Sequence, residues 1–280
     1  MRHIVWVSTT LASLAAAVPQ SAQTPSAPHL YLSMFGGYRT GRQIWTLVDQ
    51  PFQVFLRTSS GLQPNPGQQD TLDLQQQTVS GFVIGAGGTY FPSPQVGLDG
   101  QITFLGLGLE SRCAIQRYVP TDTADVDPEL CASLNGGTTS LSAVSFSVGV
   151  VARLRPDKPT YPYVRASVGL VARTRSTVEM TGLYTDRSGI PTPATVLGDA
   201  KPNKTAPHFT LGAGAAFSLG PSYQLRFEGQ YMTTRLDRVT GQADPTSGTL
   251  FPPHDERVYR SFLFTVAFDV VLEKRRGRRY

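Results

Sequence analysis

Charged side chains stand at alternate positions inside segments that are otherwise apolar or small. Arg226 and Glu228 lie two residues apart in one such segment, and Asp269 has the same setting near the C-terminus. Side chains two apart on a β-strand share one face of the sheet, so we expect these charges to gather on one side. There they could form an ion-pair network in a closed interior, which we favour, or a ring that selects ions in a pore. Four further charges share this setting: Asp99, Arg153, Arg165 and Arg173.

Cys113 and Cys131 are the two cysteines of the chain. They fall in one long connection, without a CxxC motif or a neighbouring histidine. In an oxidising compartment such a pair forms a disulfide, and a bridge across a loop of this size contributes about 3 kcal/mol by the chain-entropy estimate. We therefore predict a structural disulfide rather than a redox or metal site.

Two glycine-rich stretches, 85–88 and 212–214, have a distant similarity to nucleotide-binding loops. A phosphate-binding loop must open a helix, but the first stretch runs into a turn and the second lies inside a strand-like segment. We interpret both as small residues that make room in a crowded interior. No motif in the chain predicts a cofactor or a metal.

The elements that hold these residues are predicted to be β-strands. Apolar residues recur at every second position in eight segments, without a helical period, and turn residues separate the segments. In the third segment the apolar residues change phase, which predicts a bulge near 104–106. The eight segments are 29–38, 79–91, 96–111, 140–155, 163–180, 208–219, 223–236 and 257–272.

The connections between these strands alternate in length. In an up-and-down meander, alternate connections lie at opposite ends of the barrel. The tight turns therefore lie together at one end, and both termini of the barrel segment lie at that same end. Outer-membrane barrels sort their connections in this way. The first long connection carries Trp45, Phe52 and Phe55, which we interpret as strand extensions beyond the membrane, with an adhesive or ligand-binding surface as the alternative. The tight turns are 92–95, 156–162 and 220–222, and the long connections are 39–78, 112–139, 181–207 and 237–256.

The apolar face of the strands is predicted to contact lipid. If that face were a protein core, the opposite face would meet water and would be rich in lysine and glutamate. Instead it carries glycine, serine, threonine and isolated arginines, and the lysines lie in turns, loops or the C-terminal tail. Because a charge at the middle of the bilayer costs about 2–4 kcal/mol, Arg165, Arg226 and Glu228 should face the interior.

Both ends of the chain have a predicted role outside the barrel. Residues 1–22 have the basic start, apolar run and small residues of a secretory signal peptide. The net charge of +5 comes mostly from a basic tail, 273–280, which we expect to be periplasmic. A basic run can bind nucleic acid, but an exported protein seldom meets it, so we expect no nucleic-acid partner.

The signal peptide, the strand count, the sorted connections and the aromatic final strand FLFTVAFDVVL resemble those of the small eight-stranded outer-membrane barrels, the OmpA-like group. The resemblance covers about 28–272. It implies an all-β, eight-stranded, antiparallel up-and-down transmembrane β-barrel in a bacterial outer membrane. Short turns and both termini would be periplasmic, and long loops would lie outside. Implied partners are outer-membrane lipid, lipopolysaccharide and, during insertion, the barrel-assembly machinery.

For function, the resemblance implies a non-enzymatic protein with a structural role or an interaction surface on its outer loops, whose external ligand stays open. A narrow channel for ions or small solutes is the first alternative, and a lipid-modifying enzyme is the second. Eight-stranded barrels that deacylate lipid A use a histidine and a serine two residues apart, and His208 and Thr210 have that spacing. Threonine replaces the serine and no acidic partner is assigned, so we expect no catalytic residues.

Overall fold

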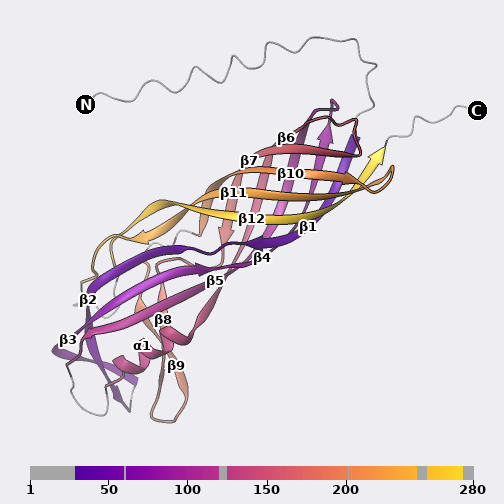
Figure 1. The fold of residues 1–280 in the computed structure, drawn as a ribbon. Helices are drawn as coiled ribbons and strands as arrows, with labels where there is room; N and C mark the ends of the chain where they lie inside the picture. The colour runs from indigo at the N-terminus through magenta and orange to yellow at the C-terminus, as the bar shows by residue number, and fades with distance from the viewer. Residues whose placement is uncertain are drawn as a thin grey trace, which may run out of the picture.

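Eight strands close into a barrel in the computed structural model (Figure 1). The structure describes residues 29–59, 61–119, 125–200, 202, 204–244 and 251–273. The predicted signal peptide, 1–22, and residues 274–280 of the predicted tail lie outside them. The barrel strands are β1 (His29–Arg39), β4 (Gly81–Phe91), β5 (Val96–Arg117), β6 (Thr138–Arg153), β7 (Thr160–Arg173), β10 (Thr205–Ser218), β11 (Tyr223–Val239) and β12 (His254–Glu273).

Each barrel strand pairs antiparallel with its neighbours in chain order. The ring closes where β1 pairs with β12, from His29 opposite Glu273 to Arg39 opposite Leu263. The first and last residues of the barrel segment therefore lie side by side, at the end of the barrel that carries the tight turns. This arrangement confirms the predicted eight-stranded, antiparallel up-and-down barrel.

The outside of the ring carries a belt of exposed apolar side chains from all eight strands. Met34 on β1, Val148 on β6 and Phe264 on β12 are 70%, 65% and 58% exposed. A monomer in water rarely exposes apolar patches above a few hundred Å², whereas an outer-membrane barrel carries an apolar band about 25 Å tall. The belt is therefore the lipid-facing surface, as the sequence predicted.

The predicted bulge near 104–106 is wrong, because β5 pairs there in continuous register with β4 and β6. Thr103, Leu105 and Leu107 all face the interior. What changes along the strand is the interior itself, which is polar in the middle of the barrel and apolar farther from the tight turns. We call the apolar layer the apolar plug; it consists of Phe35, Val83, Leu105, Leu107, Leu109, Leu141, Ala143, Val171, Met232, Leu263 and Ala267.

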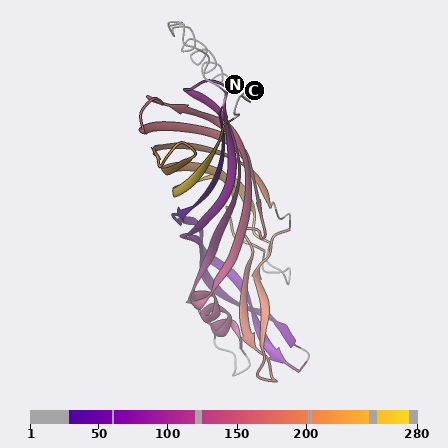
Figure 2. The same cartoon turned by 90° about the vertical axis from the view of Figure 1, so that its right-hand side faces the viewer.

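Beyond the plug, the long connections fold into a head that extends from the end of the barrel opposite the tight turns (Figures 1 and 2). The head comprises β2 (Gln43–Thr58), β3 (Gly61–Val79), residues 110–117 of β5, α1 (Asp127–Gly136) and the hairpin of β8 (Met180–Thr185) with β9 (Pro191–Leu197). β2 pairs with β3, and β3 pairs with the outer part of β5. The predicted strand extension of the first long connection is thus confirmed.

The head has a hydrophobic core of its own. Trp45 is buried in this core, and its ring N–H donates to the Thr177 carbonyl at 2.8 Å. The predicted strand 163–180 is too long, because β7 ends at Arg173 and the chain then turns to place Val178 and Met180 in this second core. The alternation of apolar residues continues past Arg173 because the residues before the turn and the residues after it are both buried. The other core residues include Leu47, Phe52, Leu72, Leu74, Val126, Leu130, Leu134, Tyr184, Val196, Leu197 and Val239.

Helix α1 was not predicted from the sequence. Pro128 lies in its first turn, where a missing N–H is tolerated, and Leu130 and Leu134 anchor it in the head core. No helix in the described part of the chain is long and apolar enough to cross a membrane.

Candidate functional site

Five of the seven predicted charges form one buried network across the middle of the barrel. On β11, Arg226 Nε lies 2.6 Å from Asp269 Oδ2, and Arg226 Nη1 lies 4.0 Å from Glu228 Oε2. Arg165 of β7 continues the network, with Nη1 3.4 Å from Glu228 Oε2 and Nε 3.7 Å from Asp99 Oδ2 of β5. No side chain in the network is more than 8% exposed.

The network has three carboxylates and two guanidinium groups, and each carboxylate also accepts a hydrogen bond from a neutral donor. The Tyr163 hydroxyl donates to Glu228 at 2.8 Å. The Thr89 hydroxyl donates to Asp99 at 2.6 Å, and the Gln224 amide donates to Asp269 at 3.0 Å. Buried charges need such compensation, so the donors allow the network to hold its excess of negative charge.

Arg153 and Arg173 lie apart from the network, at opposite ends of the barrel. Near the tight turns, the Arg153 guanidinium carbon lies 3.2 Å from the Phe91 ring centroid, and the side chain donates to the Tyr31 hydroxyl at 3.2 Å. Towards the head, Arg173 pairs with Asp237 at 3.7 Å. The shared inward face therefore does not place all seven charges in one group.

His208 and Thr210 face the interior, and each is 6% exposed. Neither side chain faces the lipid surface of the barrel. The His208 ring lies over Gly169, where an added Cβ would collide with the ring and with the Phe146 carbonyl. Glycine has the same role in both glycine-rich stretches, because a Cβ on Gly212 would collide with Glu228 and one on Gly85 would collide with Phe35.

Little empty space remains around these layers. The cavity beside the charge network has a volume of about 10 Å³, and the cavity beside His208 has about 20 Å³. One water needs about 10–15 Å³, so neither cavity holds more than one or two. The apolar plug covers these layers on the head side.

The disulfide Cys113–Cys131 joins β5 to α1, with the Cα atoms 5.2 Å apart. Asn135 supports the same junction, since its side chain accepts from the Cys113 N–H at 2.8 Å and donates to the Cys113 carbonyl at 2.7 Å. The bridge therefore attaches α1 to the strand that continues into the barrel.

Buried carboxylates form another feature of the head. Burial and the neighbouring charge of Asp125 raise the pKa of Asp127 to about 8, against a hydrogen bond from the Phe55 N–H that favours the carboxylate. Burial also raises the pKa of Asp70. Among the residues that the structure describes, no group of three histidine, cysteine or carboxylate side chains has the geometry of a metal site.

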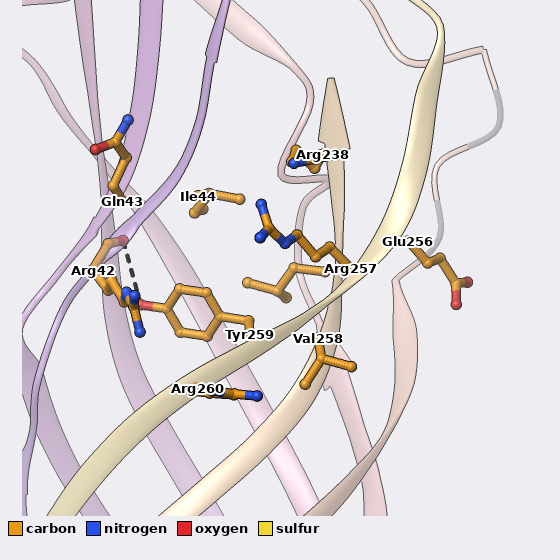
Figure 3. Close-up of a pocket in the computed structure, with 10 residues that line it drawn as sticks. Arg42, Gln43, Ile44, Arg238, Glu256, Arg257, Val258, Tyr259 and Arg260 are labelled. Carbon is orange, nitrogen blue, oxygen red and sulfur yellow. Dashed lines mark hydrogen bonds between the residues drawn. The ribbon is translucent and has the colours of Figure 1, made fainter. Parts of the chain in front are cut away.

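A pocket of about 440 Å³ opens where the barrel passes into the head (Figure 3). The Thr40 N–H donates to the Phe262 carbonyl at 2.9 Å, and beyond this bond β2 pairs with β3 while β12 continues only with β11. The pocket lies between the separated strands. Its lining consists of Arg42, Gln43, Ile44, Leu236, Arg238, Glu256, Arg257, Val258, Tyr259 and Arg260.

No pattern in the sequence indicates this arginine pocket. Arg257 and Arg260 lie in the last predicted strand, whereas Arg42 lies in the first long connection, more than 200 residues away. Only the pairing of β1 with β12 brings them together.

No family model and no curated protein matches the chain. Among solved structures, it is similar to Neisserial surface protein A, with 11% identity, a TM-score of 0.40, and coverage of 86% of this chain and 96% of that one. It is also similar to the outer membrane protein OprG from Pseudomonas aeruginosa, with 8% identity, a TM-score of 0.46, and coverage of 89% of this chain and 97% of that one. A third similar structure is that of the outer membrane protein AlkL, with 16% identity, a TM-score of 0.34, and coverage of 93% of this chain and 97% of that one. The closed ring and its apolar belt are by themselves the architecture of an outer-membrane barrel.

Proposed function

We propose that this outer-membrane barrel is a non-enzymatic protein that displays its head at the cell surface as an interaction module. The observation that carries the proposal is a folded head, with its own core and disulfide, on a barrel whose interior is filled. A filled barrel serves as a rigid anchor, and the stapled head supplies a fixed surface. Apolar side chains exposed on that surface, such as Val48, Leu183 and Ile190, are suited to contact another molecule.

The orientation of the head can be tested by labelling with a membrane-impermeant maleimide. Ser188 is exposed in the turn between β8 and β9, and Asp157 is exposed in a tight turn at the other end. Because the native cysteines are bridged, Ser188→Cys should label in intact cells, whereas Asp157→Cys should label only after the outer membrane is permeabilised. The reverse pattern would place the head in the periplasm and end the proposal.

The absence of transport can be tested with purified protein in planar bilayers. We expect no steady conductance steps, because the charge network and the apolar plug fill the interior. Reproducible steps whose ion selectivity changes in Arg226→Ala would replace the proposal with a channel. The absence of lipid-modifying activity predicts that cells expressing the protein have unchanged lipid A mass spectra.

A further inference from the structure

Three arginines of the arginine pocket have no acidic partner in the part of the chain that the structure describes. Among the described residues, no carboxylate lies within 4 Å of Arg42, Arg257 or Arg260, whereas Arg238 pairs with Asp255 at 3.4 Å. The one acidic residue of the lining, Glu256, is 3.5 Å from Arg235 on the neighbouring strand, and Figure 3 shows its side chain pointing away from the arginines. The pocket therefore has a strong excess of positive charge.

A fourth arginine lies beneath the pocket. Arg39 is only 3% exposed, donates to the Ser261 hydroxyl at 3.0 Å, and also has no carboxylate within 4 Å in the described part of the chain. Its guanidinium carbon lies 5.7 Å from the ring centroid of Tyr259, which lines the pocket above it. A buried cation needs a compensating negative charge, and an anion in the pocket would supply one across the tyrosine ring.

The pocket also lies at a defined depth relative to the membrane. Tyr38 and Phe262 face outward, are 51% and 53% exposed, and are the outermost aromatic residues of the apolar belt on β1 and β12. Aromatic side chains of membrane barrels concentrate at the interface with the headgroups. Arg42 and Arg260 follow within a few residues on the head side, which is the level of the lipid phosphates. Exposed Val258 and half-buried Ile44 add apolar contact beside them.

We infer that the arginine pocket binds the phosphate group of a membrane glycolipid, the phosphorylated lipid A headgroup of lipopolysaccharide. Guanidinium groups bind phosphate through paired, charge-assisted hydrogen bonds, and the separated strands leave the pocket open at the height of the headgroup. The inference rests on the proposed orientation of the head towards the outer leaflet. A lipid held there would fill the opening between β2 and β12 and fix the head against the membrane.

The test compares lipids that differ only in phosphate. The full chain is placed in nanodiscs of neutral phosphatidylcholine and titrated with diphosphoryl lipid A or with dephosphorylated lipid A, and bound lipid is counted by native mass spectrometry. The pocket variant is Arg42→Gln with Arg260→Gln. The control, Arg155→Gln with Lys158→Gln, removes the same charge from exposed positions in a tight turn at the opposite end of the barrel. Heat-modifiable gel mobility verifies that each variant is folded.

We expect the pocket variant to lose affinity for diphosphoryl lipid A by about 20-fold, since each arginine near a membrane surface contributes roughly fivefold, with the control unchanged. Dephosphorylated lipid A should bind weakly to all three proteins. Equal affinity in the pocket variant and the native chain would overturn the inference. So would equal binding of both lipids, which would indicate apolar contact alone. Binding of inorganic phosphate that lipid A does not displace would assign the pocket to soluble anions. Maleimide labelling decides the orientation separately, so a failure there is distinguishable from a failure to bind lipid.

Discussion

Replacing Arg226 with alanine tests whether the charge network stabilises the barrel. The substitution removes the 2.6 Å contact with Asp269 and the 4.0 Å contact with Glu228, and both acids have side chains at most 4% exposed. It leaves the network with three carboxylates and only Arg165. Removing one partner of a buried ion pair costs about 3–5 kcal/mol, so we expect the free energy of unfolding to fall by that amount.

Arg235→Ala is the matched control. Arg235 lies on the same strand, but its partner is Glu256, and the two side chains are 59% and 43% exposed. Such a surface pair contributes at most about 1 kcal/mol. The assay is urea-induced unfolding in phospholipid vesicles, followed by gel mobility. The double variant Arg226→Ala with Asp269→Ala should lose less than the sum of the single losses. Equal unfolding midpoints for Arg226→Ala and Arg235→Ala would show that the network does not stabilise the barrel, and simple addition of the two losses in the double variant would show that Arg226 and Asp269 are not partners.

Three further predictions concern the head and the packing of the interior. The double variant Cys113→Ser with Cys131→Ser removes a disulfide between residues separated by 18 positions, so it should destabilise the head by about 3 kcal/mol, as measured by Trp45 fluorescence. Barrel insertion should stay normal, and loss of insertion would show that the disulfide stabilises the whole fold. Because the pKa of Asp127 is about 8 in the folded head and 3.8 otherwise, the folded state holds more protons between about pH 4 and pH 8, so the stability of the head should fall as the pH rises through this window. Asp127→Asn should flatten that dependence, and a higher unfolding midpoint at pH 8 than at pH 5 in the native chain would contradict it. Gly169→Ala should destabilise the barrel by about 2 kcal/mol or more, because the added Cβ would collide with His208 and the Phe146 carbonyl. Gly229→Ala should be tolerated, because a Cβ there would be 3.8 Å from its nearest neighbour. Equal unfolding midpoints for the two variants would contradict this difference in packing.

The network shows how far reasoning from sequence reaches. Alternation places Arg226, Glu228 and Asp269 on the inward face, and the structure has them there. Alternation does not specify the height of a residue in the barrel, because height depends on the register between strands. Arg153 and Arg173 share the inward face but lie near opposite ends, so they contact Phe91 and Asp237 instead of the network.

The sequence by itself determined the eight strands, their order and the face that meets lipid, because a two-residue period and the sorting of short and long connections are local properties of the chain. Only the tertiary structure decided the rest. The apolar residues Leu105 and Leu107 suggested a change of phase in the strand, but they face the interior at a height where the interior itself is apolar. Whether the interior is polar or apolar at a given height depends on all eight strands. The head depends on contacts between separate long connections, such as Trp45 with Thr177. The arginine pocket exists because β12 meets β1 and then separates from β2, an outcome of ring closure that no short stretch of sequence encodes.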